Sequence, residues 1–337
     1  MSQSAAPTIG TACVAVLGTG SIGTRHLELL RGFDGVRVVA VPVRAERARE
    51  LNQAGFATAG DLDDAVRAGA THCVIATDTR RHVEDGLAAI DRGLDVLVEK
   101  PMAVNAHEAQ RLQERAHQAG RAVFVGCVLR FSESLNVFRE LVPRLGRLHA
   151  VRIECQSYLP DWRPARAYQE AYSARAEEGG VLRDLIHDID YAGWIYGWPH
   201  AIQASVRNLG RLGIAAEETA ELLWQAPEDH TVSLSLDYLT RPHRRHMRAS
   251  GEFGTLEWDG IEGTVLLSLA GDAVHVIAPP QGRDAMYAAQ LKAFLDTAHG
   301  ARNPRSATGA DGVKALAVCD AARRASQAQR LIAVEYP

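Results

Sequence analysis

Residues 12–31 read ACVAVLGTGSIGTRHLELLR. The apolar run Ala12–Leu17 predicts a buried strand, and the residues after the glycine turn have the hydrophobic spacing of an amphipathic helix. In the turn itself, Gly18 allows a tight bend, Gly20 lets backbone amides approach a pyrophosphate, and Gly23 lets the helix pack closely on the strand. Strand, glycine turn and helix in this order predict the first βαβ unit of a dinucleotide-binding domain.

The same alternation continues downstream of this turn. Apolar runs predict strands at Val36–Val41, Cys73–Ala76 and Val96–Val98, and the stretches between them predict helices at Arg47–Ala54 and His82–Gly93. Strands that alternate with helices favour a parallel sheet covered on both faces. We therefore expect residues 1–128 to form an α/β Rossmann domain with a doubly wound parallel sheet.

The pattern changes after Gly146. Apolar and polar residues alternate through Val151–Cys155 and Val232–Tyr238, which is typical of strands with one buried face. Further short strands are predicted at Met247–Ser250, Gly254–Trp258, Thr264–Ser268 and Ala273–Ile277, and helices at Asp284–Ala298 and Gly309–Ala328. We expect residues 129–337 to form an α+β domain with a mainly antiparallel sheet.

Composition narrows the class of protein. The 337 residues are 47% hydrophobic, enough for two ordinary domains, and the net charge of −4 without long runs of one sign argues against a nucleic-acid partner. The N-terminal stretch MSQSAAPTIGTAC does not resemble a signal peptide, and no apolar run approaches the roughly 18 residues of a membrane span, so we expect a cytoplasmic protein with no membrane partner. Its five widely spaced cysteines form no CxxC pair, which predicts buried free thiols.

The end of the second predicted strand bears on coenzyme choice. When NAD is preferred, this position usually carries an acidic residue that binds the ribose hydroxyls. Here the chain reads Val41-Pro42-Val43-Arg44, and Arg47 follows. Without a carboxylate, and with arginines to meet a 2′-phosphate, NADP is favoured and NAD is the alternative. Arg44 could instead be a solvated surface residue.

A Glu99-Lys100-Pro101 tripeptide ends a late strand of the predicted Rossmann domain. In this place it resembles the glucose-fructose oxidoreductase/inositol dehydrogenase family, and the resemblance covers nearly the whole chain. The other matching segments are Gly18–Gly23 with Arg25-His26, Ala76–His82, Leu129–Phe131 and Gly179–Tyr191. A bacterial branch associated with sugar and nonulosonate biosynthesis is similar at Tyr158–Pro164, Leu236–Leu239 with Arg241-Pro242, and Gly254–Asp259.

The resemblance implies a site and an assembly. Lys100 and His187 would flank the substrate carbon at the nicotinamide, with Asp184 beside them. A histidine titrates near neutral pH, which suits a general base, and a lysine can hold a developing alkoxide; which of the two accepts the proton stays open. Many members space the aspartate and histidine four residues apart rather than three, so Asp184 could instead cap a helix. The second domain's open-faced sheet commonly serves as an oligomer interface, so we expect a homo-oligomer, either a dimer or a tetramer.

The candidate residues fall into two further groups. Those expected to bind the cofactor are Gly18, Gly20, Ser21, Ile22, Gly23, Arg44, Thr77, Thr79, His82, Glu99 and Lys100. Those offering aromatic surfaces and charged donors to a sugar, including one with an anionic group, are Arg130, Tyr158, Trp162, Arg163, Tyr168 and Tyr172. Trp162 and Arg163 could instead line a loop or a subunit contact. The basic stretch Arg241–Arg248 contains two histidines, but no cysteine or carboxylate cluster completes a zinc site there, and we predict no metal.

Together these features predict an NAD(P)-dependent oxidoreductase that moves a hydride at a hydroxyl or keto carbon of a sugar, sugar derivative or cyclitol. The same scaffold supports a glycosidase that oxidises and re-reduces its substrate on a retained cofactor. A noncatalytic redox sensor is the third hypothesis, but it would be expected to lose the proton-transfer residues, and Lys100 and His187 are both present. Side-chain identities alone do not give the substrate, the carbon or the direction.

Overall fold

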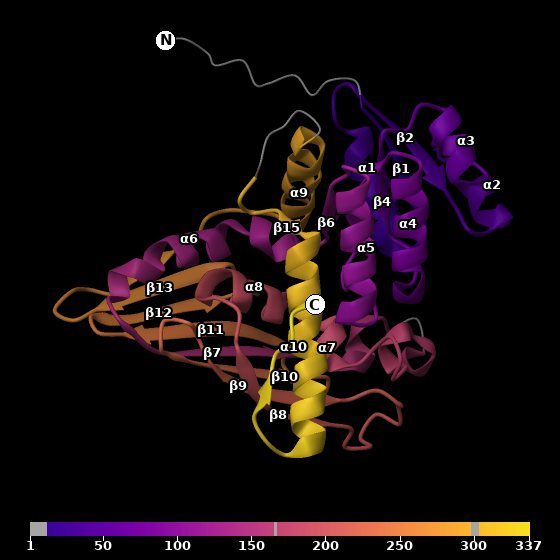
Figure 1. Cartoon of the computed structure of the whole chain (residues 1–337). Coiled ribbons are helices and arrows are strands. Elements are labelled where there is room, and N and C mark those ends of the chain that lie inside the picture. Colours follow the sequence, from indigo (N-terminus) through magenta and orange to yellow (C-terminus); the bar gives the residue numbers. More distant parts are fainter. Residues whose placement is uncertain (1–11, 165–166, 298–302) are drawn as a thin grey trace, which may run out of the picture. The chain divides into compact units, whose positions relative to one another are not determined.

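The chain folds as two units, which the computed structural model describes over residues 12–164, 167–297 and 303–337 (Figure 1). The N-terminal segment used to predict the location, and Ala298, lie outside these ranges. The first unit takes in the chain as far as Met102, then Gln110–Gly126 and Arg283–Gly309. The second takes in Ala103–Ala109, Cys127–Gly282 and Ala310–Pro337.

A seven-stranded sheet of order β15-β6-β5-β4-β1-β2-β3 forms the centre of the first unit. Its strands are β1 (Ala12–Leu17), β2 (Val36–Val41), β3 (Ala57–Thr58), β4 (His72–Ile75), β5 (Asp95–Val98), β6 (Val123–Val125) and β15 (Ala307–Thr308). All neighbours are parallel except β15 and β6. Every residue of β1 is buried, as expected for a central strand covered on both faces.

Helices cover the faces of this sheet. They are α1 (Ser21–Arg31), α2 (Ala45–Gln53), α3 (Leu62–Arg67), α4 (His82–Asp91), most of α5 (Ala106–Gln118) and α9 (Arg283–Thr297), with the single turn η1 (Thr79–Arg81). Helix α9 was expected in the second domain. It belongs to the first unit because its Leu291 and Phe294 share one apolar cluster with Leu27 and Leu30 of α1.

The second unit contains a nine-stranded sheet of order β14-β13-β12-β11-β7-β10-β9-β8-β16. Its strands are β7 (Leu148–Gln156), β8 (Ala201–Arg207), β9 (Thr219–Gln225), β10 (Thr231–Asp237), β11 (Arg244–Gly251), β12 (Gly254–Asp259), β13 (Thr264–Leu269), β14 (His275–Ile277) and β16 (Ile332–Ala333). The neighbours are antiparallel except β7 and β10. These two can be parallel because the chain passes through two helices and two strands between them, which is long enough for a crossover.

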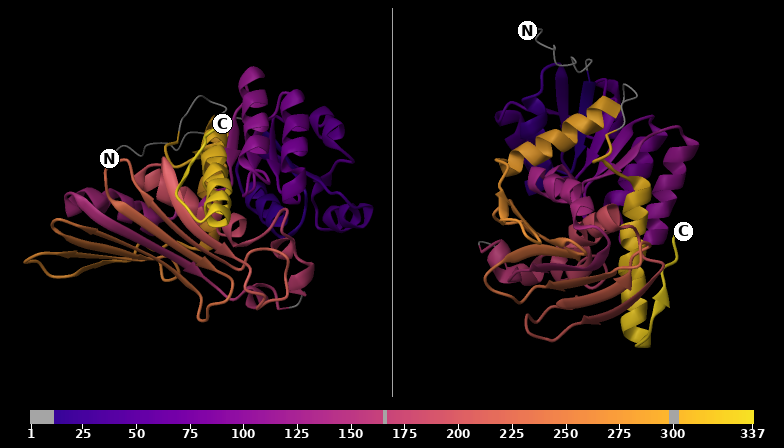
Figure 2. Two further views of the ribbon diagram at one scale, coloured as in Figure 1. Left: turned by 60° about the horizontal axis from the view of Figure 1, so that its bottom comes forward. Right: turned by 90° about the vertical axis from the view of Figure 1, so that its left-hand side faces the viewer.

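One face of this second sheet carries helices. The helices of the unit are α6 (Glu133–Leu141), α7 (Val181–Asp184), α8 (Ile186–Tyr196) and α10 (Gly309–Ala328), with single turns η2 (Val128–Phe131), η3 (Val142–Leu145), η4 (Leu159–Trp162), η5 (Tyr168–Glu170) and η6 (Tyr172–Ala174). Figure 2 shows α6 and α8 on the same side of the strands, and α6 packs on β12 and β13. Side chains that point to the other side are less buried, as at Leu223 of β9, which is 43% exposed.

These observations confirm the predicted fold class, a Rossmann unit with a mostly parallel sheet and an α+β unit with a mainly antiparallel one. All five cysteines are free and buried, as predicted. Helix α1 begins at Ser21, inside the glycine motif, because the tight turn is complete at Gly20. Within the described parts of the chain, no helix is long and apolar enough to cross a membrane.

Candidate active site

The backbone explains each glycine of the turn after β1. Gly18 has a φ of +85°, and a Cβ there would lie 2.6 Å from the backbone of Ala76. A Cβ at Gly23 would collide with the Gly18 carbonyl oxygen, so the close packing of α1 depends on both glycines. At Gly20, by contrast, nothing lies within 4 Å of the place that a Cβ would take.

Helix α1 therefore begins against open space. Its N-cap is Gly20, no side chain caps the helix, and the first turn begins with exposed Ser21 and half-buried Ile22. The first N–H groups of a helix have no partner within the helix, and they carry the positive end of its dipole. The turn thus fits the pyrophosphate of a nicotinamide dinucleotide, which these backbone amides would hold.

The two arginines after β2 differ in their surroundings. Arg47 donates from Nε to the Thr19 carbonyl oxygen (3.2 Å) and from Nη2 to Thr24 Oγ1 (2.8 Å), and it pairs with Glu50 (2.7 Å). Arg44 is exposed, and its side chain forms no hydrogen bond or ion pair with the residues that the structure describes. Of these two arginines, only Arg47 is held by polar contacts with its surroundings.

The loop after β4 uses its side chains inside the protein. Thr77 Oγ1 donates to Asp85 (2.7 Å), and Thr79 is buried. His82 is also buried, with Nδ1 2.8 Å from the Pro101 carbonyl oxygen and Nε2 3.0 Å from that of Thr77. The direct cofactor contact expected of His82 does not fit this placement, because both ring nitrogens face protein carbonyls.

Glu99 and Lys100 follow β5 directly. The Glu99 side chain is buried, and its Oε1 lies 2.7 Å from Nε2 of His26, a histidine of α1. Its Oε2 accepts the backbone N–H of Lys100 at 3.2 Å. Lys100 is half-buried and precedes a cis peptide bond to Pro101. Glu99 therefore holds the backbone that carries Lys100, and its placement does not fit the cofactor contact expected from the sequence.

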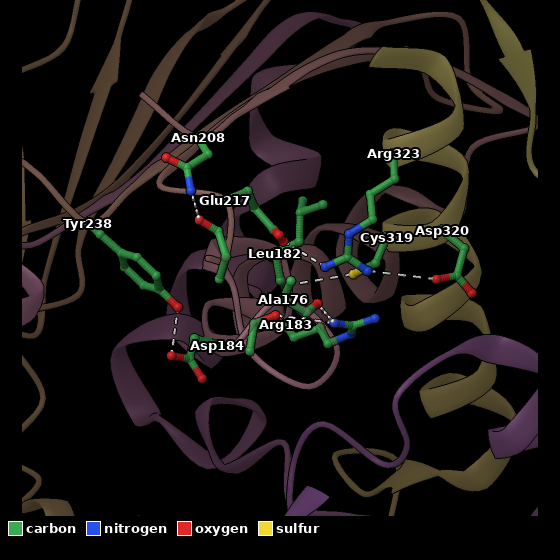
Figure 3. A network of polar contacts seen from close by, with 12 residues as sticks. Ala176, Leu182, Arg183, Asp184, Asn208, Glu217, Tyr238, Cys319, Asp320 and Arg323 are labelled. Carbon is green, nitrogen blue, oxygen red and sulfur yellow. Dashed lines mark hydrogen bonds and ion pairs between the residues drawn. The ribbon is translucent and has the colours of Figure 1, made fainter. Parts of the chain in front are cut away.

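Asp184 and His187 lie where one helix ends and the next begins. Helix α7 ends at Asp184, and the N-cap of α8 is Leu185, with no side-chain cap. The N-cap position of α8 therefore belongs to Leu185 and not to Asp184. Its Oδ2 accepts the hydroxyl of buried Tyr238 at 2.7 Å (Figure 3), and burial together with this carboxylate raises the pKa of Tyr238 well above its usual value. His187 is half-buried in the first turn of α8.

A second polar network surrounds the start of α7, and no sequence motif predicted it. Glu217 pairs with Arg323 of α10 at 2.6 Å, and a Cβ at Gly180, where φ is +90°, would collide with the Glu217 carboxylate. Arg323 also lies 4.0 Å from Asp320 (Figure 3). Gly180 is the N-cap of α7, so these groups fit closely around the first residue of the segment that carries Asp184.

Four of the six predicted substrate-binding residues line one cavity in the second unit. Its walls include Trp162, Arg163, Tyr168 and Tyr172. Burial and the Asp184 carboxylate raise the pKa of Tyr172 well above its usual value, and Arg163 acts in the opposite direction. Tyr172 therefore connects this cavity to Asp184, and Arg163 lies close enough to act on Tyr172.

The other two predicted substrate-binding residues have different surroundings. Arg130 is only 2% exposed, donates to Asp190 from two nitrogens at 2.7 and 2.9 Å, and pairs with Asp311 at 3.3 Å. A buried guanidinium with two carboxylates is already satisfied, so Arg130 does not fit the expected substrate contact. Tyr158 is not among the cavity residues; the guanidinium of Arg241 lies 3.4 Å from its ring centre.

The basic stretch forms most of β11 and pairs with acidic side chains. Arg245 reaches buried Asp188 at 3.1 Å, and His246 lies 3.3 Å from Glu257. Among the described residues, no group of three histidine, cysteine, aspartate or glutamate side chains is arranged to hold a metal ion. The stretch thus belongs to the charge pairing of the sheet.

Two family models match the chain, one in its Rossmann part and one in its second part. Residues 13–127 match an oxidoreductase family with an NAD-binding Rossmann fold, and residues 139–257 match the GFO/IDH/MocA C-terminal domain. The chain belongs to this oxidoreductase family. The predicted family and enzyme class, an NAD(P)-dependent oxidoreductase, are thereby confirmed.

Several relatives match along nearly the whole chain. The rhizopine catabolism protein MocA of Rhizobium meliloti is 28% identical over 327 residues, covering 92% of this chain and 93% of that protein. The myo-inositol dehydrogenase Hyg17 of Streptomyces leeuwenhoekii is 27% identical over 329 residues, covering 93% and 97%. A levoglucosan dehydrogenase solved with NADH shares the fold, with a TM-score of 0.87 at 16% identity, covering 97% of this chain and 100% of that one.

Proposed function

We propose that this oxidoreductase transfers a hydride between a nicotinamide cofactor and a hydroxyl or keto carbon of a sugar, sugar derivative or cyclitol. The observation that carries the proposal is the full-length similarity to a myo-inositol dehydrogenase, together with a glycine turn built for a dinucleotide. The bound nicotinamide supplies the hydride acceptor or donor. The chain's own residues must bind the substrate and move one proton at the reacting oxygen.

We propose His187 and Lys100 for this proton chemistry. In the oxidation direction, the O–H bond of the substrate breaks as the C–H bond gives up its hydride, and His187 takes the proton. The Lys100 ammonium donates a hydrogen bond to the oxygen as negative charge develops on it. In reduction the same groups act in reverse, and His187 returns the proton to the alkoxide oxygen.

Asp184 is proposed as the third member of this group. Its carboxylate accepts the Tyr238 hydroxyl and interacts with Tyr172, which lines the cavity described above. Tyr238 lies 54 residues after Asp184, and Tyr172 lies in the turn η6 that precedes α7, so the carboxylate fixes both hydroxyls relative to the helix. Asp184 would act by holding Tyr172 and the start of α8 in place for the substrate.

The cavity residues support a substrate with an anionic group. Trp162, Tyr168 and Tyr172 offer aromatic surfaces, and Arg163 has no carboxylate partner among the described residues. A guanidinium in a partly apolar cavity binds a carboxylate or phosphate more tightly than a neutral hydroxyl. The cavity encloses only about 30 Å³, room for about one water molecule, so the substrate would meet the residues of its walls rather than enter it. We propose that Arg163 binds the anionic group and that the aromatic residues contact the sugar ring.

The cofactor preference is proposed to be NADP, with NAD as the alternative. Its support is the absence of a carboxylate at the end of β2 and the unengaged guanidinium of Arg44. Arg47 cannot take this role without giving up its bonds to the glycine turn and α1. A preference for NADP would therefore depend on Arg44.

Assembly and location are proposed on separate grounds. The less buried face of the second sheet supports a homo-oligomer, dimer or tetramer, in which a second copy covers that face. Five buried free thiols support a reducing compartment, and we propose the cytoplasm.

The experiment that tests the reaction is a substrate screen. Sugars, sugar acids, sugar phosphates and cyclitols are each incubated with NAD(H) or NADP(H), and turnover is read from the nicotinamide absorbance. We expect turnover with at least one class, and faster turnover with sugar acids than with the matching neutral sugars. Cleavage of a glycoside without net cofactor change would instead indicate the retained-cofactor glycosidase, and binding without any turnover would favour the redox sensor.

A further inference from the structure

We propose that two buried histidines of the first unit, His26 and His82, are positioning residues for Lys100. The inference rests on the proposed role of Lys100. Each histidine contacts a group on the chain directly beside the lysine. His26 acts on Glu99, and His82 acts on Pro101.

The contact before Lys100 is a buried pair. His26 is fully buried, and its Nε2 lies 2.7 Å from Glu99 Oε1. The other oxygen of the same carboxylate accepts the Lys100 backbone N–H at 3.2 Å. Gly126 leaves the room for this arrangement, since a Cβ there would lie 2.9 Å from Glu99 Oε2. The imidazole of α1 thereby fixes a carboxylate that in turn holds the Lys100 amide.

The contact after Lys100 is a bridge between two loops. The two ring nitrogens of His82 lie 2.8 Å from the Pro101 carbonyl oxygen and 3.0 Å from the Thr77 carbonyl oxygen. A carbonyl can only accept, and a neutral imidazole has a single N–H, so the neutral ring donates to one of these two carbonyls at a time. His82 stands at the start of α4, with its ring between the segment after β5 and the loop after β4.

Holding the chain on both sides of Lys100 has a specific consequence. A lysine side chain has several rotatable bonds, so its ammonium can be placed accurately only if its Cα is fixed. Each histidine makes a buried polar contact with a residue next to Lys100. Removing the imidazole would leave the buried Glu99 carboxylate or the Pro101 carbonyl without that partner, which is unfavourable. If the histidines serve Lys100, their removal should reduce turnover through the lysine alone.

The test measures turnover in single and double variants. His82→Leu and His26→Leu are each made in the native chain and in a Lys100→Met chain, with His82→Gln as the conservative variant that keeps a donor. In the native chain we expect kcat to fall about 10- to 100-fold for each leucine variant, with cofactor affinity unchanged and partial recovery in His82→Gln. In the Lys100→Met chain we expect no further loss of kcat, measured in single-turnover reactions with excess enzyme.

A matched control is His230→Leu, which removes a buried histidine of the second unit and should leave kcat unchanged. If the leucine variants lower kcat equally with and without Lys100, the histidines serve the fold generally and the inference is wrong. It is also wrong if they keep native kcat while Lys100→Met loses it. If Lys100→Met itself keeps native turnover, the proposed role of Lys100 fails first, which is a separate result. A leucine variant that does not fold is replaced by His82→Gln and His26→Gln in the same comparison.

Discussion

Replacing Tyr238 with phenylalanine removes one hydroxyl from the group around Asp184. The hydroxyl donates to Asp184 Oδ2 at 2.7 Å, and both residues are buried, with exposures of 0% and 3%. The ring itself is retained, together with its edge contact to Trp162 at 5.5 Å between ring centres. Tyr238→Phe therefore deletes a hydrogen bond without creating a large cavity.

The expected size of the effect follows from the partner. A hydrogen bond to a charged group contributes about 1.5 to 3 kcal/mol to stability. A buried carboxylate that loses its donor destabilises the folded state, because the lost bond is not replaced by water. We expect Tyr238→Phe to lower the free energy of unfolding by this amount. We also expect Asp184→Asn to couple to it, so that the double variant loses at least about 1 kcal/mol less than the sum of the two single variants.

Urea unfolding followed by tryptophan fluorescence measures these differences. The matched control is Tyr196→Phe, because among the described residues the hydroxyl of this buried tyrosine hydrogen-bonds only the Met247 sulfur, at 3.5 Å. A hydrogen bond to a thioether is weak, and we expect a loss of about 0.5 kcal/mol or less. The reasoning is refuted if Tyr238→Phe costs no more than this control, or if the two losses at Tyr238 and Asp184 simply add.

Four further predictions concern the reaction, the cofactor, the assembly and pH. Lys100→Met and His187→Asn should each lower kcat by about 10² to 10⁴ with little change in cofactor affinity, and the rise of the oxidation rate with pH near neutrality should vanish in His187→Asn; its persistence would make Lys100 the better base. Arg44→Ala should weaken NADPH binding by about 1.5 to 3 kcal/mol and leave NADH nearly unchanged, and equal losses in titrations of both would place Arg44 outside the phosphate site. Sedimentation should show a homo-oligomer at micromolar concentration, and a stable monomer would contradict the proposed covered sheet face. Burial lowers the pKa of His82 and His230 below 6.5, so the folded state disfavours their charged forms. Their contribution to stability should be complete above pH 6.5 and fall on acidification, and melting curves of a His82→Gln/His230→Gln double variant should show a smaller fall.

The predicted structural elements came from interactions between near neighbours in the chain. The apolar run before Gly18 and the alternation in Val151–Cys155 are patterns of a few residues, and both formed the expected strands. The family resemblance, which also rests on short stretches of sequence, located the tripeptide with Lys100 and the segment with His187. Local patterns could not place α9, because its partner α1 is more than 250 residues earlier in the chain.

Side-chain roles required the tertiary structure. From the sequence, Arg130 and Arg163 looked alike, as arginines in segments near a cleft. Their roles differ because Asp190, 60 residues from Arg130, forms a buried ion pair with the Arg130 guanidinium. In the same way, the roles of Arg44 and Arg47 can be distinguished only because Arg47 contacts α1 and the glycine turn.

By itself, the sequence determined that this protein has a glycine turn for a dinucleotide, a mainly antiparallel second sheet and a lysine after a late strand of the first. Each depends on residues adjacent along the chain, whose periodicity and backbone freedom are local properties. The tertiary structure alone decided that His26 meets Glu99 across 73 residues and that Tyr238 meets Asp184 across 54. Such pairs form only when the packing of the core brings distant segments together. A polar side chain that becomes buried must then find a hydrogen-bond partner among the groups packed around it.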